Sequence, residues 1–141
     1  MQERQTFRNM NMTKEAHMSF PTVLIVDDSR LSRMMIRAFI TQAHPDWTII
    51  EASNGQEAIE KTATQTVDLM TIDLNMPGMD GLTLATQLQH NHPTAHITLV
   101  TANIQESVRH RAATAGMGFI AKPVSEDSVL PCLSALENRC A

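Results

Sequence analysis

The feature that most constrains the fold is a short aliphatic run that ends in two acidic residues. Residues 22–26 read TVLIV, and Asp27 and Asp28 follow directly. A continuous run of this kind, without alternating polar positions, is typical of a strand buried on both faces, as in a parallel sheet. The acidic pair then marks the point where the predicted strand leaves the core.

The same pattern repeats along the chain. Further strands are predicted at residues 48–52, 67–73, 96–101 and 118–121. Between these strands, apolar residues recur with the three- and four-residue spacing of helices. Five strands that alternate with five helices predict a single α/β domain with right-handed crossovers.

Helix boundaries are also predicted from local motifs. Asn54 with Glu57, and Asn103 with Glu106, have the form of a capping box. Pro131 falls inside the last predicted helix, where it removes a backbone hydrogen bond and clashes with the preceding turn. We therefore expect a kink at Pro131, or a helix that begins later than the apolar pattern suggests.

Charge and composition exclude several classes of protein. The net charge is −4, and because residues 1–20 contribute +1, the remainder carries −5. Nucleic-acid binders usually show a basic patch, so we expect protein partners instead. The charged residues of the first twenty positions are Glu3, Arg4, Arg8, Lys14 and Glu15.

The termini indicate the cellular context. Residues 1–20 lack the apolar stretch of a secretory signal, and we interpret them as a disordered extension that precedes a domain at 21–141. No apolar run approaches the length of a membrane span. Cys132 and Cys140 form no disulfide framework, which favours reduced thiols and a cytoplasmic location.

Polar side chains stand where the predicted strands end. The first strand ends in Asp27 and Asp28, the third in Asp73 and the fourth in Thr101, and Lys122 follows the fifth. In an open parallel sheet, ligands bind outside the carboxyl ends of the strands. Three carboxylates, one hydroxyl and one ammonium are therefore expected to converge at one edge.

Such a cluster needs a compensating charge. Two carboxylates about 5 Å apart repel by roughly 3 kcal/mol at an effective dielectric constant near 20. Either one of them binds a proton, or a divalent cation occupies the site. Hard carboxylate oxygens suit Mg²⁺, which commonly binds phosphate oxygens as well, and a lysine supplies a compact positive charge for the same oxygens.

Each of these residues has an ordinary explanation when taken alone. An acidic pair after a strand is common, an Asp before a Pro-Gly loop is often a turn residue, and a Lys-Pro dipeptide is usually part of a loop. The functional interpretation depends on their joint placement at the ends of strands one, three, four and five.

Four segments resemble the receiver domain of two-component response regulators. They read VLIVDDSRLSRMMIRAFI, DLMTIDLNMPGMDGL, LVTA and GFIAKP, and the resemblance extends from about Thr22 to the C-terminus. The segment after the acidic pair is similar to the single-domain, CheY-like members. The resemblance implies a flavodoxin-like, doubly wound parallel sheet of five strands in the order 2-1-3-4-5, with five helices.

The resemblance also implies roles for the acidic residues. Asp73 is expected to accept a phosphoryl group from a sensor histidine kinase or phosphotransfer protein. Asp28 is expected to bind Mg²⁺ directly and Asp27 to bind it through water. Asp73 and the backbone carbonyl of Asn75 would complete the protein ligands.

The remaining motif residues are implied to bind the phosphoryl group and to switch. Lys122 is expected to pair with phosphoryl oxygens, and the bond from Lys122 to Pro123 is cis in this family. Thr101, followed by Ala102 in the LVTA motif, is expected to move to the phosphoryl group. Phe119 would then rotate inward, changing a docking face on helix four, strand five and helix five for an output protein. This regulator would catalyse only its own phosphorylation and dephosphorylation and would not be an enzyme in any other respect.

Some positions depart from the family pattern. Phe119 stands where many chemotaxis members have Tyr, and a plain core residue remains an equally good interpretation. Asn75 and Asn103 occupy positions that tune the phosphoryl lifetime, so that lifetime is not predicted. Pro131 lies on the expected docking face.

Two other functions remain open. A phosphatase of the haloacid-dehalogenase type also uses an Asp after a strand, but it requires a second Asp as general acid, and Asn75 cannot donate that proton. A degenerate receiver could serve only as a docking module, although the intact set of motif residues argues against this. The cognate kinase, the output partner and the pathway stay open.

Overall fold

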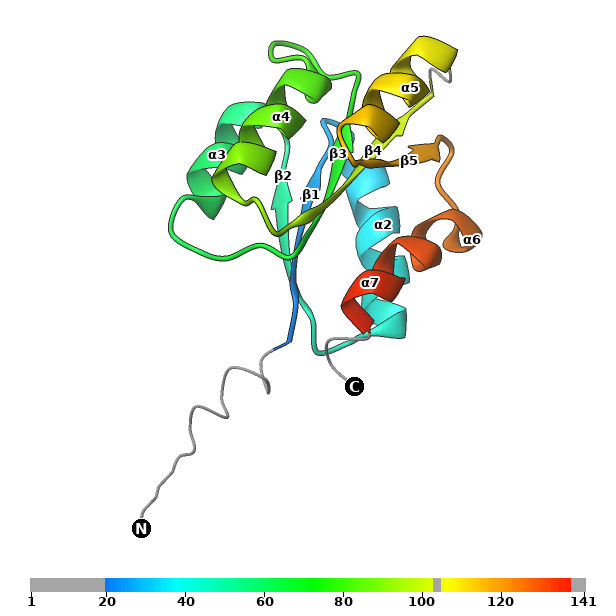
Figure 1. The fold of residues 1–141 in the computed structure, drawn as a ribbon. Coiled ribbons are helices and arrows are strands. Elements are labelled where there is room, and N and C mark those ends of the chain that lie inside the picture. The colour runs from blue at the N-terminus through cyan, green and yellow to red at the C-terminus, as the bar shows by residue number, and fades with distance from the viewer. Residues whose placement is uncertain (1–19, 103–104, 138–141) are drawn as a thin grey trace.

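The computed structural model describes residues 20–102 and 105–137 (Figure 1). Five parallel strands form one sheet in the order β2-β1-β3-β4-β5, which confirms the predicted flavodoxin-like topology. The strands are β1 (Thr22–Val26), β2 (Thr48–Ala52), β3 (Leu69–Asp73), β4 (His96–Thr101) and β5 (Gly118–Ala121).

Helices cover both faces of this sheet. The helical segments are α2 (Arg30–Ala43), α3 (Gly55–Thr62), α4 (Gly81–Asn91), α5 (Glu106–Thr114), α6 (Glu126–Val129), the 3₁₀ segment η1 (Leu130–Leu133) and α7 (Ser134–Glu137). Helices α3, α4 and α5 lie on one face, and α2 and the α6–η1–α7 segments lie on the other (Figure 1). This arrangement gives the sheet two apolar cores.

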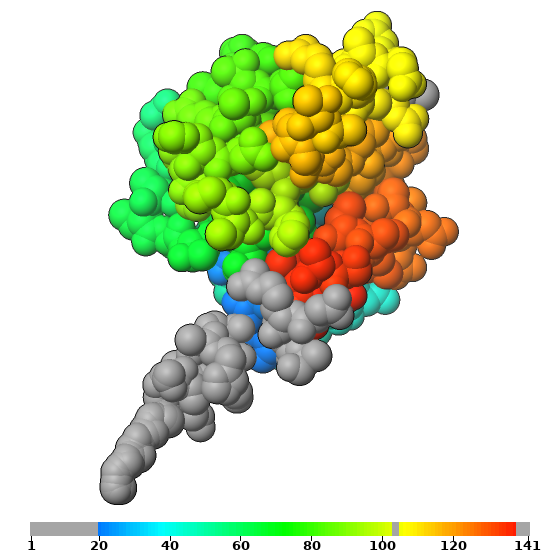
Figure 2. All heavy atoms as spheres, in the orientation of Figure 1, coloured from blue at the N-terminus to red at the C-terminus, as the bar shows by residue number. Residues whose placement is uncertain are grey.

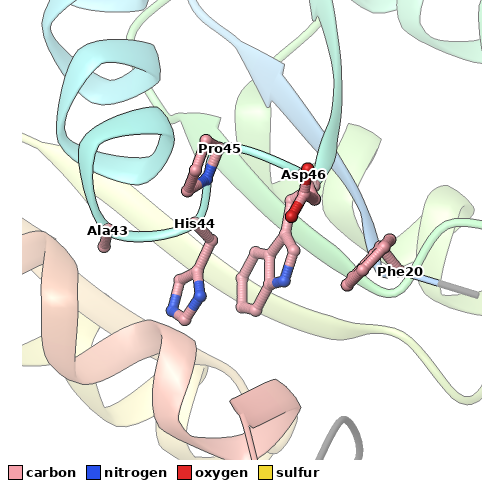
Figure 3. Close-up of a pocket in the computed structure, with 6 residues that line it drawn as sticks. Phe20, Ala43, His44, Pro45 and Asp46 are labelled. Carbon is pink, nitrogen blue, oxygen red and sulfur yellow. The ribbon is translucent and has the colours of Figure 1, made fainter.

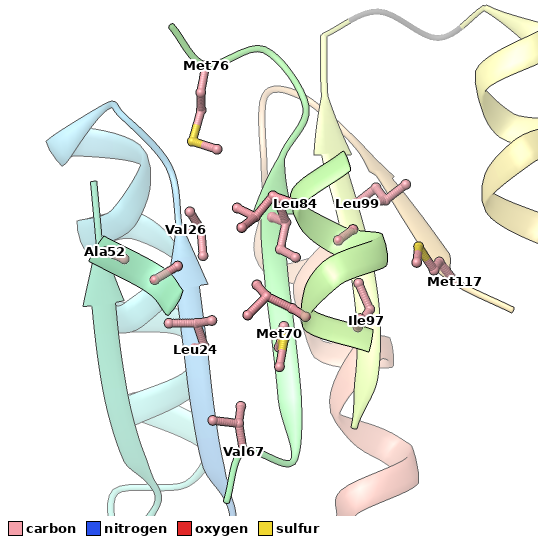
Figure 4. Close-up of a cluster of buried hydrophobic side chains, with 14 of the residues drawn as sticks. Leu24, Val26, Ala52, Val67, Met70, Met76, Leu84, Ile97, Leu99 and Met117 are labelled. Carbon is pink, nitrogen blue, oxygen red and sulfur yellow. The ribbon is translucent and has the colours of Figure 1, made fainter. Parts of the chain in front are cut away.

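The first strand explains why both cores form. Leu24 and Val26 point into the core beneath α3 and α4, where Figure 4 shows them beside Met70 and Leu84. Val23 and Ile25 point into the core beneath α2 and α6. Successive side chains of a strand alternate between faces, so a run that is apolar at every position suits a sheet covered on both sides.

The third strand begins two residues later than predicted. Leu69 is its first residue, because Asp68 bonds to the start of β1 instead. The Asp68 N–H donates to the Thr22 carbonyl at 2.9 Å, and the Asp68 carboxylate accepts from the Thr22 N–H at 2.9 Å. Val67 is nevertheless buried in the core beneath α4.

The capping predictions had different outcomes. The Asn54 side chain accepts from the Glu57 N–H at 2.8 Å, as expected of an N-cap. The carboxylate of Glu57, however, accepts from the Ser53 N–H and not from Asn54. The second predicted box is wrong: α5 begins only at Glu106 with Gln105 as its N-cap, and Asn103 lies outside the described residues.

The last helix is broken where Pro131 falls. Residues 130–133 form a 3₁₀ turn between two short α-helical segments, which confirms the expected interruption. A proline lacks the N–H that a continuous α-helix would use at this position. The apolar stripe survives the break, since Val129, Leu133 and Leu136 are all buried.

The ends of the chain leave some predictions untested. Residues 1–19 and 138–141 lie outside the described part, so the interpretation of the N-terminal extension and of Cys140 stays a prediction. Within residues 20–102 and 105–137, no helix has both the length and the apolar character needed to span a bilayer.

A close approach at Gly81 yields the first prediction. A Cβ at Gly81 would clash with the carbonyl oxygen of Asp73, so Gly81→Ala forces the start of α4 away from the end of β3. We expect this overpacking to lower the free energy of unfolding by about 1 to 3 kcal/mol in urea titrations. In the control Gly55→Ala, the nearest atom is the Met79 sulfur at 3.1 Å, on a flexible side chain, so the loss should be smaller. Equal losses for both variants would contradict the argument.

Candidate functional site

Three carboxylates meet at the carboxyl edge of the sheet. Asp27, Asp28 and Asp73 each offer an oxygen, and these oxygens all lie within 4.8 Å of one another. The strand pairings explain their proximity, because β1 lies beside β3 in the sheet. Asp27 and Asp73 are 1% and 2% exposed, whereas Asp28 is exposed, so the cluster is open to solvent on one side.

Lys122 supplies the positive charge of the cluster. Its Nζ lies 3.2 Å from Asp27 Oδ2 and 3.5 Å from Asp73 Oδ2. Burial alone would lower the pKa of Lys122, but the attraction of Asp27 and Asp73 outweighs it and the pKa is raised. The Lys122 N–H donates to the Thr101 carbonyl at 2.8 Å, and the bond to Pro123 is cis, as the resemblance implied.

Backbone contacts hold Asp27 in place. Its Oδ1 accepts from the Ser29 N–H at 2.9 Å, and its carbonyl accepts from Arg33 Nη1 at 2.7 Å. The other carboxylate oxygen, Oδ2, is buried and receives no well-aligned hydrogen bond within the described residues, although the Lys122 ammonium faces it. Asp27 Oδ2 therefore keeps acceptor capacity for a further cation.

The environment of Asp73 raises the pKa of its carboxyl group. Burial raises its pKa from the ordinary 3.8 to about 6, and the charge of Asp27 adds to the rise. The Asn75 N–H, which donates to Asp73 Oδ1 at 3.1 Å, and the Lys122 ammonium both act to lower this pKa. One lysine thus leaves the three carboxylates incompletely neutralised.

This donor set fits Mg²⁺. The ion prefers hard oxygen ligands in octahedral geometry and usually keeps several waters. Two buried carboxylates, one exposed carboxylate and an open side provide that combination, and Asp27 Oδ2 keeps capacity to accept a hydrogen bond from a metal-bound water.

Thr101 connects the acidic cluster to the fourth strand. It is fully buried at the end of β4, and its hydroxyl accepts from Asn75 Nδ2 at 2.9 Å. Ala102, the next residue, is exposed. The loop that carries Asn75 is thereby bonded to the strand next to the one that carries Asp73.

Phe119 lies one strand away from this hydroxyl. Its ring is half-buried and packs against the core beneath α4 and α5. The guanidinium carbon of Arg109 lies 5.6 Å from the centre of the ring. Phe119 is therefore not an enclosed core residue, and part of its surroundings is a charged group on α5.

Two arginines near the site were not predicted from the sequence. Arg33 links α2 to the cluster, because it donates to the Asp27 carbonyl and pairs with Glu51 at 3.1 Å. Arg109 contacts Phe119, ten positions later in the sequence. Arg33 lies in the first of the four receiver-like segments, but no role was expected for it, and Arg109 lies outside those segments. Only the folded arrangement reveals what the two arginines contact.

Among the hollows formed by the described residues, one lies at each end of the sheet. An apolar groove of about 370 Å³, lined by Leu31, Met35, Pro123 and Val124, opens beside Lys122. A second hollow of about 240 Å³ lies around the loop between α2 and β2 (Figure 3). This loop leads into the start of β2, so the hollow is at the end of the sheet opposite the acidic cluster.

The second hollow corrects one expectation. Trp47 follows His44, Pro45 and Asp46 in a loop, where a half-exposed side chain is expected, but only 8% of Trp47 is exposed. The ring of His44 stacks on the indole with 3.9 Å between centroids, and His44 Nε2 lies 2.7 Å from Glu137 Oε2. These contacts cover Trp47 and connect the α2–β2 loop to the end of α7.

Comparison with known proteins identifies the family. The model of the response regulator receiver domain matches residues 23–133. The chain belongs to the response regulator receiver domain family. Membership supports phosphorylation-dependent signalling rather than conventional enzyme catalysis, and receiver domains bind Mg²⁺ at an acidic pocket and interact with kinases and downstream targets.

Individual relatives agree with this assignment of a CheY-like receiver domain. The chemotaxis protein CheY of Bacillus subtilis (strain 168) is 36% identical over 117 residues, which cover 82% of this chain and 97% of that relative. A protein-glutamate methylesterase/protein-glutamine glutaminase of Moorella thermoacetica is 40% identical over 116 residues, but the match covers only 27% of that relative and 79% of this chain.

A solved structure gives a three-dimensional match. The CheX–CheY–BeF₃–Mg²⁺ complex from Borrelia burgdorferi superposes with a TM-score of 0.74 at 28% identity, covering 83% of this chain and 89% of that chain.

The buried charge of Asp73 yields the second prediction. Above pH 6 the carboxylate is ionised in both the folded and the unfolded receiver domain, and the folded state bears the cost of the raised pKa. Asp73→Asn removes that charge, so we expect it to raise the free energy of unfolding by about 1 to 3 kcal/mol at pH 7.5 without divalent cations.

The sign of the effect is specific. Between about pH 6 and pH 4 the folded protein binds a proton at Asp73 that the unfolded chain does not, so this group's penalty on the wild type shrinks as the pH falls. The advantage of Asp73→Asn should therefore disappear near pH 4. Asp80→Asn, an exposed N-cap control, should change stability little at either pH. A pH-independent advantage for Asp73→Asn would refute the explanation.

Proposed function

We propose that residues 21–141 form a phosphorylation switch in which Asp73 accepts a phosphoryl group from a sensor histidine kinase or phosphotransfer protein. The observation that carries this proposal is the position of Asp73. Its buried carboxylate stands within 4.8 Å of two further carboxylates and 3.5 Å from an ammonium, at the open edge of a parallel sheet.

The transfer step follows from this geometry. A carboxylate oxygen of Asp73 forms a bond to phosphorus while the bond from phosphorus to the donor's imidazole nitrogen breaks, and the electron pair leaves with that nitrogen. Phosphoryl transfer depends mainly on positioning and charge neutralisation. The Lys122 ammonium, already beside Asp73 Oδ2, would pair with a phosphoryl oxygen.

Mg²⁺ is the proposed cofactor. Asp28 would bind it directly, Asp27 through water, and Asp73 and the Asn75 carbonyl would complete the protein ligands. When bound, the ion neutralises charge on the phosphoryl oxygens. The clustered carboxylates support this proposal, as does the presence of Mg²⁺ in the Borrelia burgdorferi complex.

Thr101 and Phe119 are proposed to convert the chemical change into a new surface. The Thr101 hydroxyl, which accepts from Asn75, would turn toward the phosphoryl group, and the Phe119 ring would move inward into the space left. Ala102, which is exposed and directly follows β4, adjoins this movement. Phosphorylation adds charge and strong acceptor oxygens, which can reorder a neighbouring segment in this way.

The proposed docking face comprises α5, β5 and the α6–η1–α7 segments. Figures 1 and 2 show α5 and the C-terminal segments on the same side of the molecule. An output protein would bind this face. The break at Pro131 would determine the shape of the part that the α6–η1–α7 segments form. The Borrelia burgdorferi relative was solved with CheX, which supports a protein partner for this chain. We propose that the partners are proteins and not nucleic acids. We also propose a cytoplasmic location, which is in keeping with the proposed kinase.

The third prediction tests the chemistry. A small acyl phosphate donor with Mg²⁺ should label the wild-type protein, as measured by intact-protein mass spectrometry at neutral pH. Asp73→Asn should abolish labelling because it removes the attacking carboxylate, and chelation of Mg²⁺ should abolish it because the phosphoryl charge is left unneutralised. The control Asp46→Asn, an exposed carboxylate at the opposite end of the sheet, should label normally.

Three outcomes would point elsewhere. Equal labelling of wild type and Asp73→Asn would refute the proposed acceptor. Sustained release of phosphate from phosphate esters would favour a phosphatase of the haloacid-dehalogenase type, despite the Asn at position 75. Failure to bind Mg²⁺ at millimolar concentration would favour a docking module that works without phosphorylation.

A further inference from the structure

A contact between α5 and β5 brings a charge to an aromatic ring. The guanidinium carbon of Arg109 lies 5.6 Å from the centre of the Phe119 ring. This distance is within the approximately 6 Å over which a cation is attracted to an aromatic face. Arg109 is exposed and the Phe119 ring is half-buried. One side of the ring therefore packs against the apolar core, and another side faces Arg109.

In the described ranges 20–102 and 105–137, no carboxylate competes for this guanidinium. Among the described residues, Arg109 forms no ion pair, and the only acidic residue of α5, Glu106, does not pair with it. Its neighbours His110 and Arg111 are basic or neutral and offer no compensating negative charge. Within the part of the chain that the structure describes, the Phe119 ring is thus the group that the Arg109 guanidinium contacts.

The strand register places this contact next to the proposed switch. Phe119 is paired with Leu99, and Thr101 with Ala121, so Phe119 and Thr101 are diagonal neighbours on adjacent strands. They also share a face of the sheet, because side chains two positions apart on a strand point the same way. Phe119 has no hydroxyl, so packing and the contact with Arg109 are what hold its ring where it is.

We propose that Arg109 is a positioning residue. It stabilises the half-buried orientation of the Phe119 ring and thereby opposes inward movement of that ring. The inference rests on the proposed function, which requires that movement. The contact with Arg109 is lost when the ring moves inward, so it favours the unphosphorylated arrangement. An exposed cation–π contact would bias this equilibrium by about two- to fivefold.

Beryllofluoride with Mg²⁺ provides the test, because it forms a tetrahedral anion that can stand in for a phosphoryl group on a carboxylate. Its affinity would be measured by NMR titration at saturating Mg²⁺ for the wild type and for Arg109→Ala, Arg109→Lys, Phe119→Leu and the double variant Arg109→Ala/Phe119→Leu. We expect Arg109→Ala to tighten binding about two- to fivefold. Arg109→Lys, which keeps a cation near the ring, should retain most of the wild-type value.

The direction of the change in beryllofluoride affinity distinguishes this role from a general effect of charge. Loss of a positive charge by itself weakens the binding of an anion. Lys61→Ala, which removes an exposed charge on α3, should therefore leave the affinity unchanged or weaken it slightly. In the Phe119→Leu background, Arg109→Ala should have no tightening effect, because the ring through which Arg109 acts is absent.

A second measurement reports on the ring directly. Without beryllofluoride, the Phe119 ring signals of Arg109→Ala should shift part of the way toward those of the saturated wild type. Unchanged or weaker affinity in Arg109→Ala would overturn the role of Arg109 while leaving the switch intact, and so would equal tightening with and without Phe119. A wild type that binds no beryllofluoride would instead overturn the proposed function, and this inference with it.

Discussion

The repulsion among Asp27, Asp28 and Asp73 is the constraint on which the rest of the structure depends. These carboxylates come from the ends of two strands that are far apart in the sequence, and parallel pairing of β1 with β3 forces them together. Lys122 offsets only part of the charge, because one ammonium faces three carboxylates. Burial, together with the charge of Asp27, raises the pKa of Asp73 despite the nearby Lys122. The fold thus keeps repelling carboxylates close together. A proton, a cation, or a phosphoryl group together with a cation can reduce this repulsion.

The surrounding structure prevents the three carboxylates from moving apart. Apolar side chains on both faces of the sheet fix the strands, and the start of α4 is packed against the end of β3 at Gly81 so closely that no Cβ fits. The Asn75–Thr101 hydrogen bond then connects the charged loop to β4, and Phe119 lies on the next strand. These contacts form a contiguous set from the loop beside Asp73 to β5, and the proposed switch depends on them.

Particular residues show how far sequence reasoning extended. The strand ends that carry Asp73 and Thr101 were predicted correctly, because a short apolar run followed by a polar residue is a local pattern. The start of β3 was missed, since Asp68 is bonded to Thr22, 46 positions away. The predicted cap at Asn103 failed because α5 begins at Glu106, and Trp47 is covered by contacts from His44, which itself pairs with Glu137.

The order of apolar and polar residues by itself determined the class of fold, the number of strands and which residues stand at their carboxyl ends, because these properties follow from patterns within a few positions. Only the tertiary structure decided which of those ends lie within bonding distance, how deeply each carboxylate is buried, and which arginine contacts Asp27 or Phe119. Such properties depend on distances between segments remote in the chain, and burial sets the strength of each charge interaction.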